Sequence, residues 1–221
     1  MTGIAGNYSS ILERIGSAAE RAGRSADSIQ LIAVTKTVPS GRIEEAVACG
    51  VKHIGENRVQ EALAKRDALA SAALTWHFIG HLQTNKAKKV VENFNCVQSV
   101  DRLEAAEALA RFAANRQPLP VLIEVKLQDE PNKSGAGEMD LPNLVPALQR
   151  LDSLQLRGFM AVPPPTEDPE QARPFFRRLR KLAGDFGLTE LSMGMTNDFE
   201  VAIEEGATMV RIGTGLFGAR L

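Results

Sequence analysis

The sequence predicts an α/β fold, a TIM (β/α)8 barrel with an extra N-terminal helix. From residue 30 onward, short β-branched runs alternate with longer helical patterns, which is typical of strand–helix units in a parallel sheet. Eight such runs are present, and the 221-residue chain, with 44% hydrophobic residues, has the size of one barrel domain. A doubly wound open sheet is the alternative, but the G-x-G-x-x-G turn that it needs after the first strand is missing.

The first thirty residues predict the extra helix. Their apolar residues recur at helical spacing, without the long apolar run of a signal peptide. No stretch of the chain approaches the roughly 18 apolar residues of a membrane span, so we expect a cytoplasmic protein that does not enter membranes. The expected buried face of this helix consists of Ile11, Leu12, Ile15, Ala18, Ala19 and Ala22.

The eight predicted strands follow one another along the rest of the chain. Segments 128–137 and 163–169 are expected to be loops, and loops after barrel strands line the active face because the strands end there. The strands are predicted at residues 30–34, 52–55, 76–80, 96–100, 121–126, 155–162, 190–195 and 209–213.

Capping residues predict where the intervening helices begin and end. A serine or aspartate before an apolar periodic run favours a helix start, and a glycine after it favours a stop. The start signals are Ser40, Asp101 and Asp140, and the stop signals are Gly50, Gly187 and Gly206.

Composition argues against several classes of protein. The formal net charge is −1, so no global field points toward nucleic acid or an anionic membrane. No repeat, low-complexity tract or linker divides the chain, so residues 1–221 are expected to form a single barrel domain. Cys49 and Cys96 have no partners at metal-ligand spacing, so we predict no metal site and expect both to be buried packing residues.

Lys36 is the first candidate for chemistry. It follows the run QLIAVT directly, which places its amine at the carboxyl end of the first strand, where barrel sites are built. Partial removal from water favours the neutral amine, which can form a Schiff base with an aldehyde. An ordinary solvated loop lysine is the alternative interpretation.

The loop after the seventh strand has the features of a phosphate site. Gly194 would let the backbone approach an anion, and Thr196 offers a hydroxyl group. Asn197 and Glu200 have the spacing of a capping box that opens the next helix. The loops after strands seven and eight form the phosphate site in many barrels.

The loop after the eighth strand repeats this pattern with Gly213, Thr214 and Gly215. Two ordinary glycine turns are the alternative. Arg211 shares a face with Gly213 and should therefore point into the barrel mouth, where a buried guanidinium needs a partner. That partner is either the pyridine nitrogen of a cofactor or a carboxylate of another strand. Arginine would leave a pyridine nitrogen uncharged, which weakens the ring as an electron sink and disfavours transamination-type chemistry.

Seven ordered motifs resemble one known family, the pyridoxal phosphate homeostasis proteins, which are single-domain relatives of the alanine racemase N-terminal barrel. The motifs are LIAVTKT, HIGENRVQE, WHFIGHLQTNK, NKSG, RGFMAVPP, LSMGMTND and MVRIGTGLFGAR. The resemblance implies a pyridoxal 5′-phosphate (PLP) site built from these residues: Lys36 as the internal aldimine, Asn57 beside the cofactor, Arg211 at the pyridine nitrogen, and Met195, Thr196, Gly213 and Thr214 around the phosphate.

Some positions depart from the family pattern or have weaker assignments. Thr196 occupies a position where the family usually has serine, which keeps the hydroxyl and adds a methyl group. His81 occupies a position where proline is common. His77 and Gly194 are possible neighbours of the cofactor, with a hydrogen-bonded core histidine as the alternative for His77. Lys133 is a second amine near the mouth.

The resemblance implies a PLP carrier or buffer in intracellular PLP homeostasis, with PLP and PLP-dependent apoenzymes as partners. An amino-acid racemase is the alternative, but it needs a second base, which alanine racemase takes from a tyrosine delivered with a further β domain. The single tyrosine, Tyr8, lies in the N-terminal helix, and neither cysteine has an adjacent base. We therefore expect no catalytic residues and a monomer. A third reading is a lyase whose Lys36 attacks a sugar phosphate.

Overall fold

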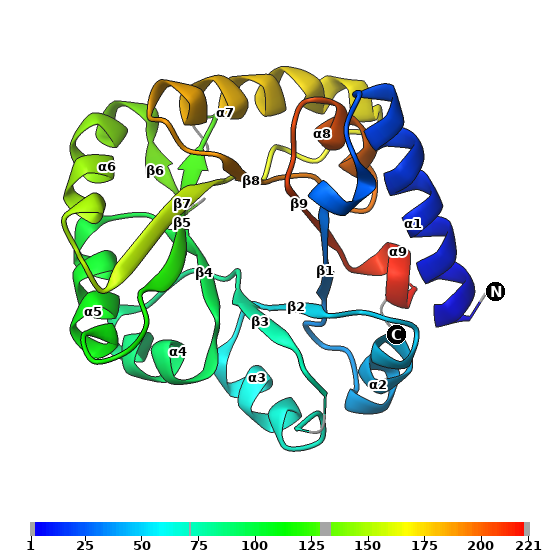
Figure 1. Ribbon diagram of the computed structural model, residues 1–221, viewed down its shortest axis with the longest axis horizontal. Coiled ribbons are helices and arrows are strands. Elements are labelled where there is room, and N and C mark those ends of the chain that lie inside the picture. Colours follow the sequence, from blue (N-terminus) through cyan, green and yellow to red (C-terminus); the bar gives the residue numbers. More distant parts are fainter. Residues whose placement is uncertain (1–2, 71, 129–133, 219–221) are drawn as a thin grey trace.

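A computed structural model describes residues 3–70, 72–128 and 134–218. The strands form a closed parallel barrel surrounded by helices (Figure 1), which confirms the predicted fold. The order around the barrel is β4-β3-β2-β1-β9-β8-β7-β5, and β4 pairs with β5 to close it. The barrel strands are β1 (Gln30–Val34), β2 (His53–Glu56), β3 (Thr75–Phe78), β4 (Cys96–Val100), β5 (Leu119–Lys126), β7 (Leu154–Met160), β8 (Glu190–Ser192) and β9 (Met209–Ile212).

The predicted strands agree with the observed ones to within a few residues. The largest difference is at β8, which ends at Ser192 because the chain turns at Gly194, whose φ is +89°. One strand was missed: β6 (Ala136–Gly137), inside a segment expected to be a loop, pairs with the end of β5.

Helices form the outer ring of the barrel (Figure 1). The glycines predicted to end helices do so at positive φ: Gly50 after α2, Gly187 after α7 and Gly206 after α8. The helices are α1 (Ile4–Arg21), α2 (Ser40–Ala48), α3 (Val59–Arg66), α4 (Ala87–Asn93), α5 (Leu103–Ala113), α6 (Leu141–Gln149), α7 (Arg173–Asp185), α8 (Phe199–Glu204) and α9 (Thr214–Phe217), with 3-10 turns at Ala26–Ser28, Thr84–Lys86, Glu138–Asp140 and Pro169–Ala172.

The N-terminal helix α1 lies on the outer side of the barrel and packs against α8 and α9 (Figure 1). Its buried face is formed by Ile4, Ile11, Ile15, Ala18 and Ala19. Leu12 was expected on this face but is 43% exposed. The buried face of α1 is therefore narrower than the sequence pattern indicated. Within the described residues, no helix is long and apolar enough to cross a membrane.

Two separate sets of apolar side chains fill the protein. The larger one lies between the strands and the helices. A small cluster of Ile32, Leu122, Met160 and Met209 lies inside the barrel. Because side chains alternate along a strand, this cluster identifies the inward-facing positions, and the residues two further along each strand face the carboxyl-terminal mouth.

The cysteines only partly follow the prediction. Cys96 is buried, and burial raises the pKa of its thiol to about 12, whereas Cys49 is half-buried rather than internal. No group of histidine, cysteine, aspartate and glutamate side chains in the described part of the chain could hold a metal ion. The structure therefore offers no reactive thiolate at Cys96.

Candidate functional site

A cavity of about 430 Å³ opens at the carboxyl ends of the strands. It brings together residues from the ends of six strands that are far apart in the sequence. All seven residues assigned to the cofactor by resemblance line it: Lys36, Asn57, Met195, Thr196, Arg211, Gly213 and Thr214. His77 and Gly194, the two weaker candidates, are not among its lining residues.

Lys36 lies in a tight turn between β1 and α2. The carbonyl oxygen of Thr35 accepts a hydrogen bond from the Val38 backbone N–H at 2.9 Å, so Lys36 and Thr37 are the two central residues of the turn. Thr37 has a φ of 63°, which is strained for a β-branched residue. Its N–H donates to Glu61 Oε2 at 3.1 Å, so α3 helps to hold the strained turn.

A buried ion pair between β2 and α3 supports this turn through the Thr35 carbonyl group. Lys65 Nζ lies 2.6 Å from Glu56 Oε1 and donates to the Thr35 carbonyl oxygen at 2.7 Å. The Thr35 hydroxyl donates to the same Glu56 oxygen at 2.6 Å. Glu56 is 0% exposed and Lys65 is 8% exposed, so both charges lie in the layer between barrel and helices. The interactions connect β1, β2 and α3 at the base of the Lys36 turn.

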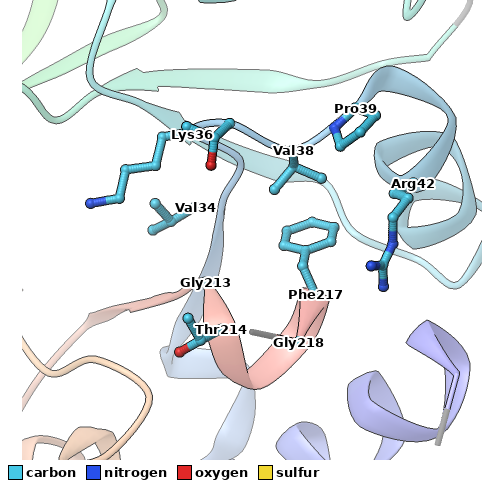
Figure 2. Close-up of a pocket in the computed structure, with 10 residues that line it drawn as sticks. Val34, Lys36, Val38, Pro39, Arg42, Gly213, Thr214, Phe217 and Gly218 are labelled. Carbon is cyan, nitrogen blue, oxygen red and sulfur yellow. The ribbon is translucent and has the colours of Figure 1, made fainter. Parts of the chain in front are cut away.

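A second pocket of about 310 Å³ flanks the turn on its other side. Val38, Pro39 and Phe217 give it apolar walls, and Arg42 lies at its edge (Figure 2). Figure 2 shows the Lys36 side chain extending away from Phe217 and Arg42. The amine of Lys36 is therefore directed away from the apolar part of this pocket.

Arg211 is 4% exposed and lies in the wall of the larger cavity. Its Nη1 donates to Ser192 Oγ at 2.6 Å and its Nη2 to the Ala161 carbonyl oxygen at 2.9 Å. Burial lowers the pKa of Arg211 to about 10, opposed by the negative charges of Glu124 and Asp198, so the group stays charged at neutral pH. The close partners of Arg211 among the described residues are a hydroxyl and a carbonyl group, and the carboxylates of Glu124 and Asp198 act on it through their charge.

The two glycine-containing loops meet, as expected. Thr196 Oγ1 accepts a hydrogen bond from the Gly215 backbone N–H at 3.2 Å and lies 3.3 Å from Thr214 Oγ1. Packing gives a further reason for a glycine at position 194. A Cβ atom at Gly194 would lie 2.5 Å from the Ala202 Cβ, so the glycine is required for packing against α8.

The expected capping box at Asn197 and Glu200 is absent. The N-cap of α8 is Asp198, whose Oδ1 accepts a hydrogen bond from the Met195 backbone N–H at 2.6 Å. Glu200 instead forms an ion pair with Arg14 of α1 at 2.8 Å. Asp198 thus fixes the loop that carries Met195 and Thr196.

The histidines have structural contacts. His77 is buried, and its Nε2 lies 3.1 Å from His53 Nδ1. Burial lowers its pKa to about 3. These contacts agree with a hydrogen-bonded core histidine and not with a residue that lines the cavity. His81 Nδ1 lies 3.3 Å from Asp101 Oδ2 and is half-exposed. Lys133 lies outside the described residues.

Comparison with known proteins identifies the family. The sequence matches the alanine racemase N-terminal domain family over residues 7–221. It is 47% identical over 223 residues to the pyridoxal phosphate homeostasis protein of Pseudomonas aeruginosa, covering 100% of this chain and 97% of that protein. The chain belongs to the pyridoxal phosphate homeostasis protein family. The resemblance drawn from the sequence motifs is therefore confirmed.

Solved structures agree with this family assignment. PipY of Synechococcus elongatus PCC7942, solved with PLP bound, is 40% identical with a TM-score of 0.84, covering 94% of this chain and 100% of that chain. Alanine racemase of Corynebacterium glutamicum has a TM-score of 0.66 at 18% identity, covering 95% of this chain and 60% of that chain. The second likeness concerns the barrel fold alone.

This member of the pyridoxal phosphate homeostasis protein family also has a carboxyl group that the sequence analysis missed. Glu124 lies two residues after the inward-facing Leu122 on β5, so it faces the barrel mouth. Burial raises its pKa to about 7; Asp101 adds to the shift, while Arg211 and a hydrogen bond with Ser134 oppose it. Strand alternation was the signal that could have found Glu124.

Glu124 should make the stability of this family member depend on pH. Its folded pKa of about 7 exceeds the ordinary value of 4.5, so the folded protein binds more protons between these pH values and unfolding becomes easier as pH rises through them. We expect Glu124→Gln to remove this slope and to raise the free energy of unfolding by on the order of 2 kcal/mol above pH 8. Urea unfolding at acidic and alkaline pH measures the free energy of unfolding of both proteins and therefore the slope.

The exposed helix residue Glu107 provides a matched control for the charge change, as Glu107→Gln. This control should keep the slope of the unaltered protein. An unchanged slope in Glu124→Gln would show that Glu124 does not titrate in this range.

Proposed function

We propose that this chain binds PLP in the larger cavity through Lys36 and acts as a carrier or buffer of the cofactor in PLP homeostasis. The observation that carries the proposal is the meeting of one primary amine, one buried arginine and two glycine-hydroxyl loops around a single cavity. The name of the Pseudomonas aeruginosa relative and the PLP bound to PipY support the same ligand.

The polar groups of the cavity fit PLP. Asn57 Oδ1 is buried and has no hydrogen-bond partner among the described residues, so it can accept a hydrogen bond from a ligand hydroxyl group. Arg211 uses only two of its five N–H donors in the contacts described above, so it can donate to a ring nitrogen. A volume of about 430 Å³ lies within the usual range of small-molecule sites.

Each part of the site would have a separate task. Met195, Thr196, Gly213 and Thr214 would hold the phosphate, and Asp198 would keep the Met195 loop in place. Bound PLP supplies an aldehyde that condenses with a primary amine and releases water. Lys36, held by its strained turn, would provide that amine. Arg211 would hold the ring nitrogen without giving up a proton.

We propose a carrier rather than an enzyme because a racemase needs a second base across from Lys36. Tyr8 packs in α1 near Gly50, outside the barrel, and burial raises the pKa of its hydroxyl further. Glu124 is the group that the racemase alternative would have to use, since it faces the mouth and its pKa is about 7.

Two measurements test this proposal. The PLP-loaded protein should restore activity to a PLP-dependent apoenzyme, and amino acids incubated with it in deuterated water should exchange their α-protons no faster than with free PLP. Enzyme-like exchange that is lost in both Lys36→Ala and Glu124→Gln would support the racemase instead. Failure to take up PLP would exclude both the carrier and the racemase, and a lyase whose Lys36 attacks a sugar phosphate would be the remaining alternative.

The remaining expectations complete the proposal. The whole chain would act as one domain, as a monomer in the cytoplasm, with PLP-dependent apoenzymes as the recipients of the cofactor. Light scattering of the purified protein tests the monomer directly.

A further inference from the structure

A single line of polar side chains crosses the barrel interior from the cavity to the opposite end. Arg211 Nη1 lies 2.6 Å from Ser192 Oγ, which lies 2.7 Å from Gln98 Oε1. Gln98 Nε2 lies 3.1 Å from His77 Nδ1, and His77 Nε2 lies 3.1 Å from Nδ1 of His53, the first residue of β2. The four residues from Arg211 to His77 are each at most 4% exposed.

The guanidinium of Arg211 and the orientation of the Gln98 amide together fix the direction of every hydrogen bond in this line. A guanidinium can only donate, so Ser192 Oγ accepts from it and turns its own proton toward the Gln98 carbonyl oxygen. The Gln98 amide nitrogen can only donate, so His77 Nδ1 accepts. Neutral His77 must then carry its proton on Nε2 and donate it to His53 Nδ1.

The middle of the line cannot easily reverse. The Gln98 amide nitrogen also donates to Met209 Sδ at 3.4 Å, so turning the amide over would place its carbonyl oxygen against that sulfur and would require His77 to move its proton to Nδ1. A proton added to His77 Nδ1 would face the Gln98 N–H. The low pKa of His77, caused by burial and by His53, is consistent with this arrangement.

We propose that Ser192 and Gln98 are positioning residues that hold Arg211 in a fixed orientation at the cavity wall, and that the resulting one-way hydrogen-bond line sets the tautomers of His77 and His53. The last step rests on the proposed function: held in this way, Arg211 would present its remaining N–H donors to the ring nitrogen of PLP and keep that nitrogen unprotonated. The charged groups that act on the line are Glu124 and Asp198 at Arg211, and Lys52 at His53.

The line itself can be tested in the cofactor-free protein by NMR of ¹⁵N-labelled histidine. The chain has three histidines, so the side-chain signals can be assigned by substitution. We expect His77 as the neutral Nε2–H tautomer from about pH 5 to about pH 8. Gln98→Glu keeps the shape but replaces the N–H donor with an acceptor, so His77 should move its proton to Nδ1 or become protonated.

Ser192→Ala serves as a second variant that introduces no charge. It removes the group that orients the Gln98 amide, so both His77 tautomers should appear. Finding the Nδ1–H tautomer in the unaltered protein, or no change in either variant, would overturn the proposed direction of the line.

The effect on Arg211 is tested with PLP labelled with ¹⁵N in its ring. Ser192→Ala removes one of the two described anchors of the guanidinium, so we expect PLP to bind about tenfold more weakly. The ring-nitrogen signal should also move toward the protonated form. Leu122→Met is the matched control, because Leu122 is fully buried in the same barrel interior but outside the line.

The outcomes separate the inference from the proposed function. If the unaltered protein does not bind PLP, the proposed function and the last step of the inference both fail. The histidine signals would still show whether the hydrogen bonds of the line have the proposed direction. If PLP binds normally and Ser192→Ala behaves like Leu122→Met in affinity and ring signal, the positioning role is wrong.

Discussion

Replacing Lys36 by alanine is expected to abolish covalent attachment of PLP and to weaken its binding by at least about a hundredfold, equal to about 2.8 kcal/mol. The substitution removes the amine that condenses with the aldehyde, and leaves the loops around Thr196 and Gly213 for noncovalent binding of the phosphate. Absorbance titration measures the affinity. Borohydride reduction followed by peptide mass analysis should find the cofactor on the Lys36 peptide of the unaltered protein and on no peptide of the variant.

Lys126 provides the matched control, because it is the half-buried lysine at the end of β5 and so lies at the end of another barrel strand. Lys126→Ala should retain attachment at Lys36 with nearly unchanged affinity. Cofactor fixed to Lys126, or attachment that persists in Lys36→Ala, would contradict the assignment of the amine.

The parts of the site that could be predicted from the sequence depend on local signals. Lys36 follows a β-branched strand directly, and Thr196, Gly213 and Thr214 lie in short loops whose place in a barrel is known. The inward direction of Arg211 follows from the two-residue period of a strand. Such signals require only neighbours in the sequence and the barrel topology.

The parts that were missed depend on contacts between distant segments. Gln98 and Ser192 are 94 residues apart, and neither differs in sequence from an ordinary polar strand residue. Lys65 looks like a solvated helix lysine, yet it is buried against Glu56. Leu12 shows the reverse error, since an apolar residue at suitable spacing remained exposed. Contacts across the barrel interior decide the case of Gln98 and Ser192, and the packing of the helices on the barrel decides those of Lys65 and Leu12.

Replacing Lys65 by methionine is expected to lower the free energy of unfolding by about 3 to 5 kcal/mol, because it leaves the Glu56 carboxylate buried without its cation. Glu56 Oε2 already has no hydrogen-bond partner among the described residues, so little compensation is available. Chemical denaturation at neutral pH measures the loss. Lys88→Met on the exposed face of α4 is the control for removing a lysine charge, and should change stability by less than about 0.5 kcal/mol.

A double variant separates the stability of the ion pair from its support of the Lys36 turn. Combining Glu56→Gln with Lys65→Met leaves no buried charge, so part of the lost stability should return. The Thr35 carbonyl would still lack its bond from Lys65, and the strained turn at Thr37 would lose that support. We therefore expect the double variant to attach PLP more slowly than the unaltered protein although part of its stability returns. Attachment at the unaltered rate would mean that the ion pair stabilises the fold without positioning Lys36.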